Sequence, residues 1–209
     1  SVRAVPEAWL REVAQHWSAG PLHMHVSEQP AEIRACLAEH QLRPVELLQR
    51  VGLLGPRFTA VHAIHLSNTE IAALGSTHSN VCACPSTERN LGDGIVPADS
   101  LRQAGATVSL GSDSHAHIDL LDDAHQLEGH LRLARLRRNV FHGGEGDPNG
   151  LGRALLDCLT VNGARAAGVT VGALTPGEPA DFVTIDLHHP TLAGVPSSSL
   201  LTGVTLSAA

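Results

Sequence analysis

Four polar side chains lie at or just after the ends of three apolar, strand-like runs. His25 and Glu28 belong to LHMHVSE, His62 belongs to FTAVHA, and Asp113 follows ATVSL in the segment GSDSH. Imidazole and carboxylate groups are suitable ligands for Zn²⁺, which lowers the pKa of bound water toward neutrality. A carboxylate nearby can then carry a proton from that water to a leaving group. The residue types therefore predict hydrolytic chemistry at a metal ion.

The order of these residues predicts a separate role for each. Glu28 lies three residues after His25 and is expected to carry the proton. His62 is expected to donate a hydrogen bond to the oxygen or nitrogen of a tetrahedral intermediate. His25 and Asp113 are the two secure metal ligands, whereas a catalytic zinc usually has about three ligands from the protein. At least one ligand is therefore expected from outside these motifs.

The elements that position these side chains follow from hydrophobic periodicity. Strands are expected at 21–26, 58–63, 79–83 and 106–110, and helices at 5–17, 30–40, 44–51, 68–74, 98–105, 119–139 and 151–167. Gly75 is expected to end its helix, and the segment CPSTERNLGDG is expected to be irregular because turn formers dominate it. Alternating strands and helices of this kind predict an α/β fold with a parallel sheet covered by helices.

The spacing of the polar residues is compatible with a (β/α)₈ barrel. Such a barrel uses about 31 residues for each strand–helix unit. His25 and His62 are 37 residues apart, and His62 and Asp113 are 51 residues apart with one further strand between them. Because barrel active sites form at the carboxyl ends of the strands, all three side chains are expected at one mouth. The alternative is a set of core histidines satisfied by hydrogen bonds, which explains one of these residues but not all three.

The sequence changes character near Val171, where a boundary is expected. Residues 1–171 carry the strand–helix alternation, whereas 172–209 contain turns, one alternating strand within GALTPGEPADFVTIDL and at most one further strand. The C-terminal segment is therefore expected to be a small β segment.

Composition excludes several classes of partner. The chain has 209 residues, a formal charge of −7, 2% aromatic residues and no lysine. These values argue against nucleic acid, which needs cationic and stacking side chains, and exclude a catalytic lysine. No run of about 18 apolar residues predicts a membrane span. The four cysteines are too few for a disulfide framework and are interpreted as buried thiols in the cytoplasm.

The motifs HMHVSEQ, VHAIHLS, CPSTERNLGDG and GSDSH, in this order, resemble the metal-dependent amidohydrolase superfamily. More narrowly, STE-x-NLGDG and the opening SVRAV resemble the bacterial formimidoylglutamate deiminases of histidine breakdown. Those enzymes convert N-formimidoyl-L-glutamate and water to N-formyl-L-glutamate and ammonia. The resemblance extends to about residue 187 and implies a TIM-type barrel with one zinc ion in each active site.

The resemblance implies roles for individual residues. His25 and Asp113 would bind zinc, Glu28 would shuttle the proton, and His62 would contact and polarise the substrate. Asp113 would also accept a proton from the water, and Arg3 would hold a carboxylate of a small anionic substrate. The alternative for Arg3 is a solvated arginine. Other polar residues receive supporting roles: His23 and His65 in packing, His115 in lining the mouth or orienting Asp113, and Glu88 and Asp93 in shaping their loop.

The resemblance also implies that much of the barrel lies outside this sequence. The family has an early His-x-His pair on its first strand, and the resemblance implies that this chain begins just before the fifth strand. It would therefore form the second half of a barrel, whose open edges require a partner. That partner is expected to be the first half of the barrel or another copy of the chain.

Two alternatives to the amidine-hydrolysing enzyme remain at this point. The first is a deaminase in the same superfamily that acts on a guanine-like heterocycle. The second is a non-catalytic fragment that folds against or binds a partner chain.

Overall fold

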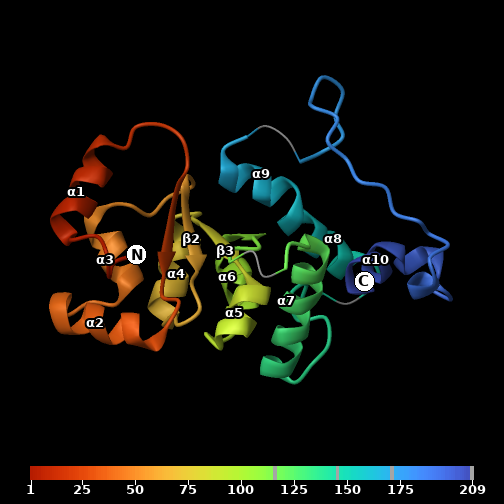
Figure 1. The fold of residues 1–209 in the computed structure, drawn as a ribbon, viewed down its shortest axis with the longest axis horizontal. Coiled ribbons are helices and arrows are strands. Elements are labelled where there is room, and N and C mark those ends of the chain that lie inside the picture. The colour runs from red at the N-terminus through yellow and green to blue at the C-terminus, as the bar shows by residue number, and fades with distance from the viewer. Residues whose placement is uncertain (115–116, 145, 170–171, 208–209) are drawn as a thin grey trace.

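A parallel sheet of four strands forms the centre of the computed structural model, which describes residues 1–114, 117–144, 146–169 and 172–207 (Figure 1). The strands are β1 (Leu22–Val26), β2 (Phe58–His62), β3 (Asn80–Ala83) and β4 (Thr107–Leu110), and they lie side by side in chain order. Val26 pairs with His62, and Ala83 pairs with Leu110. The carboxyl ends of all four strands therefore meet at one edge.

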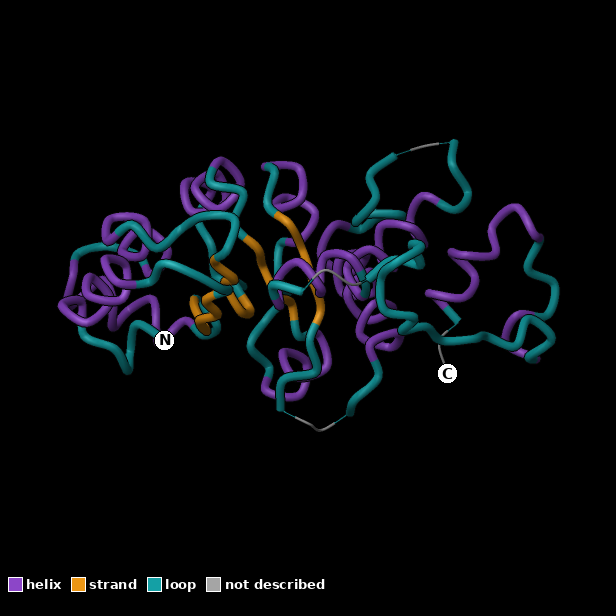
Figure 2. The backbone as a smooth tube through the Cα atoms, turned by 90° about the horizontal axis from the view of Figure 1, so that it is seen from above, coloured by secondary structure: helices purple, strands orange, loops and turns teal. Residues whose placement is uncertain are grey.

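Helices connect the strands and pack beside them (Figure 2). Phe58, Leu47 and Leu74 are fully buried where the sheet and helices meet, and every residue of β2 is buried. The helices are α1 (Glu7–His16), α2 (Pro30–His40), α3 (Pro44–Val51), α4 (Asn68–Ser76), α5 (Pro85–Leu91), α6 (Ala98–Ala104), α7 (Leu120–Arg135), α8 (Gly150–Leu159), α9 (Val161–Ala167) and α10 (Leu200–Leu206), with 3₁₀ turns η1 (Pro190–Leu192) and η2 (Ser197–Ser199).

The predicted α/β class with a parallel sheet is confirmed. A four-stranded parallel sheet with connecting helices is what part of a barrel contains. That this sheet is the second half of a barrel stays a prediction. Within the described residues, no helix has the length and apolar character needed to cross a lipid bilayer. The four cysteines are free thiols, and three of them are buried.

Three segments that follow β3 differ from their predictions. The segment PSTERNL is helix α5 rather than irregular, because Pro85 suits a first turn and Gly92 adopts the left-handed conformation that ends a helix. The single helix predicted over 151–167 is two helices, α8 and α9, which are separated at Thr160. The helix predicted over 119–139 ends at Arg135.

The prediction of a C-terminal β segment is also wrong for the described residues. No strand occurs within 172–207, and Phe182 and Val183 are 67% and 83% exposed. An alternating run becomes a strand only when a neighbouring strand accepts its hydrogen bonds, and none does so here. Farther along, α10 packs against α8, where the Gly152 N–H donates to Thr202 Oγ1 at 3.1 Å. The predicted boundary at Val171 lies outside the described residues.

The prediction that Gly75 ends its helix is wrong. Gly75 lies inside α4, where α4 packs against α6. A Cβ atom at this position would lie 2.1 Å from the carbonyl oxygen of Ala104. Gly75→Ala is therefore expected to destabilise the chain by roughly 1–3 kcal/mol, the usual cost of overpacking. Urea unfolding, read as the shift in the midpoint, measures this change.

Gly129→Ala is the matched control for that prediction. Gly129 also lies inside a helix, α7, but a Cβ atom there would meet nothing within 4 Å. Because alanine has the higher helix propensity, this variant should gain up to about 1 kcal/mol. Equal stability changes in the two variants would contradict the close approach of α4 and α6.

Candidate active site

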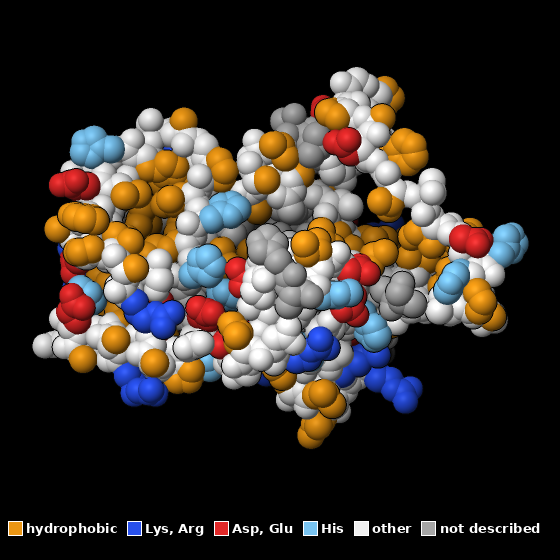
Figure 3. Space-filling view, in the orientation of Figure 1, with side chains coloured by type: hydrophobic (Ala, Val, Ile, Leu, Met, Phe, Trp, Pro, Cys, Tyr) orange, Lys and Arg blue, Asp and Glu red, His pale blue; other side chains and the backbone are white. Residues whose placement is uncertain are grey.

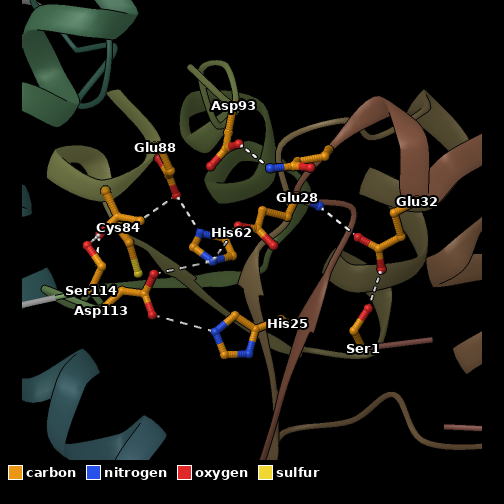
Figure 4. A network of polar contacts seen from close by, with 12 residues as sticks. Ser1, His25, Glu28, Glu32, His62, Cys84, Glu88, Asp93, Asp113 and Ser114 are labelled. Carbon is orange, nitrogen blue, oxygen red and sulfur yellow. Dashed lines mark hydrogen bonds and ion pairs between the residues drawn. The ribbon is translucent and has the colours of Figure 1, made fainter. Parts of the chain in front are cut away.

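The predicted site residues converge at the carboxyl ends of the strands (Figure 4). His25 Nε2 lies 3.6 Å from Asp113 Oδ1, and His62 Nε2 lies 3.8 Å from Asp113 Oδ2. Glu28 Oε1 is also 3.8 Å from His62 Nε2. Histidine and acidic side chains gather in the same central region of the face shown in Figure 3. The sequence therefore predicted which residues meet, and their individual roles stay predictions.

The backbone is strained at and just after the strand ends that carry these side chains. Asp113 has φ 50° and His62 has φ 70°, in the left-handed region that non-glycine residues seldom adopt. Ser27 and Ala63 beside them share this conformation, and the Ala63 N–H donates to the Val26 carbonyl at 3.0 Å. Strain of this kind persists where surrounding contacts enforce it, and it clusters at functional sites.

Three of these side chains fit a divalent metal ion. The ligand atoms of His25, His62 and Asp113 all lie within 4.8 Å of one another. Two ligands of one tetrahedral zinc, each about 2.0–2.2 Å from it, are separated by roughly 3.3–3.6 Å. Within the described ranges, the buried His62 Nε2 has no hydrogen-bond partner, so this atom can face a ligand. The geometry thus places His62 beside the two predicted metal ligands, within reach of a group bound at the same place.

Glu88 contacts His62 in a way that the sequence interpretation missed. The Nδ1 atom of His62 lies 3.3 Å from Glu88 Oε1, which also accepts the Cys84 N–H at 2.8 Å. Glu88 is the fourth residue of α5, which starts two residues after the end of β3, and this position was a usable signal. The contact fixes the ring, with Nδ1 toward Glu88 and Nε2 toward the site.

Charges around His62 determine its protonation. Burial alone lowers the pKa of His62, but the hydrogen bond and charge of Glu88, together with Glu28 and Asp113, outweigh burial and raise it. Burial raises the pKa of Glu88, despite its contacts with His62 and the Cys84 N–H. These surroundings favour a proton on His62 Nε2, which would then donate toward the site.

Arg3 reaches the site from the segment before α1. Its Nη2 atom lies 3.5 Å from Glu28 Oε2, and its side chain keeps 40% of its surface exposed. A guanidinium group with free donors binds carboxylates in a bidentate manner. Arg3 thus presents a partly exposed guanidinium group next to Glu28, and its binding of an anionic substrate stays a prediction.

The remaining predicted residues surround the site without facing it. His23 Nε2 contacts the carbonyl of Ala166 at 2.7 Å, and His65 Nε2 contacts the carbonyl of Asp93 at 2.8 Å. The Asp93 side chain accepts a hydrogen bond from Gln29 Nε2 at 2.9 Å. These contacts agree with packing and loop-shaping roles. His115 lies outside the described residues.

Known proteins of similar sequence include a deiminase and several deaminases. Formimidoylglutamate deiminase of Pseudomonas aeruginosa is 34% identical over 205 residues, which cover 96% of this chain and 44% of that protein. The 5′-deoxyadenosine deaminase of Methanothermobacter thermautotrophicus is also 34% identical, over 82% of this chain and 39% of that protein. The chain thus spans less than half the length of these relatives.

Solved structures show the same fold. An amidohydrolase from Brucella melitensis matches with a TM-score of 0.84 at 35% identity, over 95% of this chain and 43% of that one. An adenosine deaminase from Xanthomonas campestris with bound zinc matches with a TM-score of 0.82 at 25% identity, over 94% and 45%. A sequence model described as "Amidohydrolase family" matches residues 4–207. The chain therefore belongs to the amidohydrolase family.

Proposed function

We propose that this chain carries part of the active site of a zinc-dependent hydrolase that converts N-formimidoyl-L-glutamate to N-formyl-L-glutamate and ammonia. The observation that carries the substrate assignment is Arg3, which offers exposed donors for a carboxylate 3.5 Å from Glu28. 5′-Deoxyadenosine, which is named for another relative, carries no carboxylate. The similarity to the deiminase of P. aeruginosa supports the same substrate.

The described residues supply the proton transfers of this reaction. A zinc ion held by His25 and Asp113 would lower the pKa of a bound water. Asp113 would accept one proton of the attacking water as the water oxygen bonds to the amidine carbon. Glu28 would carry this proton and the remaining hydroxyl proton to the departing nitrogen, so that the carbon–nitrogen bond breaks and the nitrogen leaves as ammonia. His62, oriented by Glu88, donates a hydrogen bond to the tetrahedral intermediate.

We also propose that the chain acts together with the first half of the barrel. The chain covers 44% of the deiminase it resembles. His25 and Asp113 supply two ligands, fewer than the roughly three that a catalytic zinc takes from the protein. Below, "complete barrel" means this chain together with a segment that corresponds to the first half of its relatives, on the same or a second polypeptide. A cytoplasmic location and a part in histidine breakdown belong to this proposal.

Ammonia release from different substrates tests the proposed function. The zinc-loaded complete barrel should release ammonia from N-formimidoyl-L-glutamate with a kcat/KM at least about 100-fold above that for 5′-deoxyadenosine or guanine, because a buried polar site rejects ligands that leave its groups unpaired. A coupled assay for ammonia, with all substrates at matched concentrations, measures the ratio. A higher kcat/KM for either heterocycle would replace this proposal with the heterocyclic deaminase. Absence of ammonia from every substrate would favour the non-catalytic fragment.

A further inference from the structure

Glu32 is a fully buried carboxylate next to the candidate site, in the first turn of α2. Its Oε2 atom accepts the backbone N–H of Glu28 at 3.1 Å. Its Oε1 atom accepts the hydroxyl of Ser1 at 3.2 Å. Figure 4 shows the Glu32 carboxylate between Ser1 and the backbone of Glu28. One carboxylate thus joins the loop after β1 to the segment before α1.

These contacts form a closed ring that includes both proposed substrate-facing residues. The Arg3 N–H donates to Ser1 Oγ at 3.3 Å, and Ser1 in turn donates to Glu32. Glu32 accepts from the Glu28 backbone, and the Glu28 side chain lies 3.5 Å from the Arg3 guanidinium. The distance between the anion-binding group and the proton-carrying group is therefore set through Glu32.

Glu32 lacks the arginine or histidine partner that usually accompanies a buried carboxylate. Among the described residues, no nitrogen of either type lies within 4.0 Å of its carboxylate, and its charge acts instead on the amino group of Ser1, whose pKa it raises against the effect of burial. Burying a carboxylate without a close ion pair is costly, and the N-terminus of an 11-residue helix offsets only part of that cost. A residue kept mainly for stability would be expected to have a cationic partner, as Glu70 does.

Glu70 provides a matched comparison within the same chain. It is also fully buried and occupies the equivalent third position of α4 after β2. Its carboxylate pairs with Arg43 Nε at 2.6 Å and accepts the Val45 N–H at 3.1 Å. None of these partners is a proposed substrate-facing residue. Glu70 therefore has the contacts of a structural carboxylate, and Glu32 does not.

We propose that Glu32 is a positioning residue through which the site selects anionic substrates by their chain length. It holds Glu28 and Arg3 at one spacing, so that a substrate carboxylate on Arg3 places the amidine carbon next to Glu28. This inference rests on the proposed function. A site with this fixed spacing distinguishes N-formimidoyl-glutamate from N-formimidoyl-aspartate, whose side chain is shorter by one methylene group.

The test compares Glu32→Gln with Glu70→Gln in the zinc-loaded complete barrel. A glutamine keeps the size of the side chain but replaces one of its two acceptor oxygens with an amide group. Glu32→Gln should lower kcat/KM for N-formimidoyl-L-glutamate at least about 10-fold and lower its preference over the aspartate homologue at least about threefold, since one methylene is worth about 10–200-fold in a fitted site. Its Tm should change by less than about 3 °C.

The control should show the opposite pattern. Glu70→Gln should lower Tm by several degrees, because it breaks a buried ion pair, and should leave the substrate preference of the folded protein unchanged. An unchanged preference in Glu32→Gln would overturn the proposal. The proposal would also be overturned if Glu32→Gln lowered Tm as much as Glu70→Gln does while the folded fraction of Glu32→Gln kept the parent activity.

A readout without substrate separates this inference from the proposed function. If neither formimidoyl compound is hydrolysed, the proposed function fails, but the ring of contacts can still be measured. Amide hydrogen exchange at Glu28 should be at least about 10-fold faster in Glu32→Gln than in the parent protein, because its acceptor is weakened. Unchanged exchange at Glu28 would show that Glu32 does not hold this loop.

Discussion

Glu28→Gln in the zinc-loaded complete barrel is expected to lower kcat for ammonia release by roughly 10²–10⁴-fold, the usual contribution of a general acid–base group. Glutamine fills the same space beside His62, but it cannot carry a proton between the water and the leaving nitrogen. Because Glu28 is not a proposed metal ligand, zinc content should stay at the parent level. Steady-state ammonia assays together with metal analysis measure both quantities.

Glu39→Gln is the control for this substitution. Glu39 belongs to the same region, in α2, but its side chain is 71% exposed and does not face the site. This variant should keep the parent kcat and zinc content. Parent-level turnover in Glu28→Gln would remove Glu28 from the proton transfer, and a parallel loss of zinc would reassign it as a metal ligand.

Asp113→Asn is expected to lower kcat at least about 10³-fold, because it removes both a metal ligand and a proton acceptor. The Asp113 carboxylate lies 3.6 Å from the ring nitrogen of His25 and 3.8 Å from that of His62. An uncharged amide binds zinc weakly, so the variant should also retain less zinc after dialysis. Metal analysis of the dialysed protein and the ammonia assay should therefore show parallel losses.

Asp157→Asn is the control for the loss of charge. Asp157 is exposed on α8, away from the described site. Its replacement should change neither zinc content nor kcat. Normal turnover with full zinc in Asp113→Asn would contradict the proposed metal centre and remove Asp113 from both of its proposed roles.

The site could be predicted from the sequence because parallel strands have a simple geometry. His25, His62 and Asp113 each come at or shortly after the end of an apolar strand. The carboxyl ends of parallel strands share one edge of the sheet, so the convergence required no knowledge of side-chain contacts. The strands themselves were readable because each is a short apolar run between turn-forming residues.

The errors concern features that depend on packing. Gly75 is inside α4 because α6 approaches it closely, and no local pattern shows that approach. The run around Phe182 has the alternation of a strand, but alternation cannot supply a neighbouring strand. In contrast, helix α5 was missed although Pro85 and Gly92 are ordinary start and stop signals, and the contact of Glu88 with His62 was missed with it.

The most direct test of the metal centre is an anomalous diffraction map at the zinc absorption edge, recorded from crystals of the complete barrel. We expect one peak about 2.0–2.2 Å from both a ring nitrogen of His25 and a carboxylate oxygen of Asp113, with Glu28 and His62 facing it. A fully occupied zinc bound elsewhere, with these four side chains apart, would contradict the central claim.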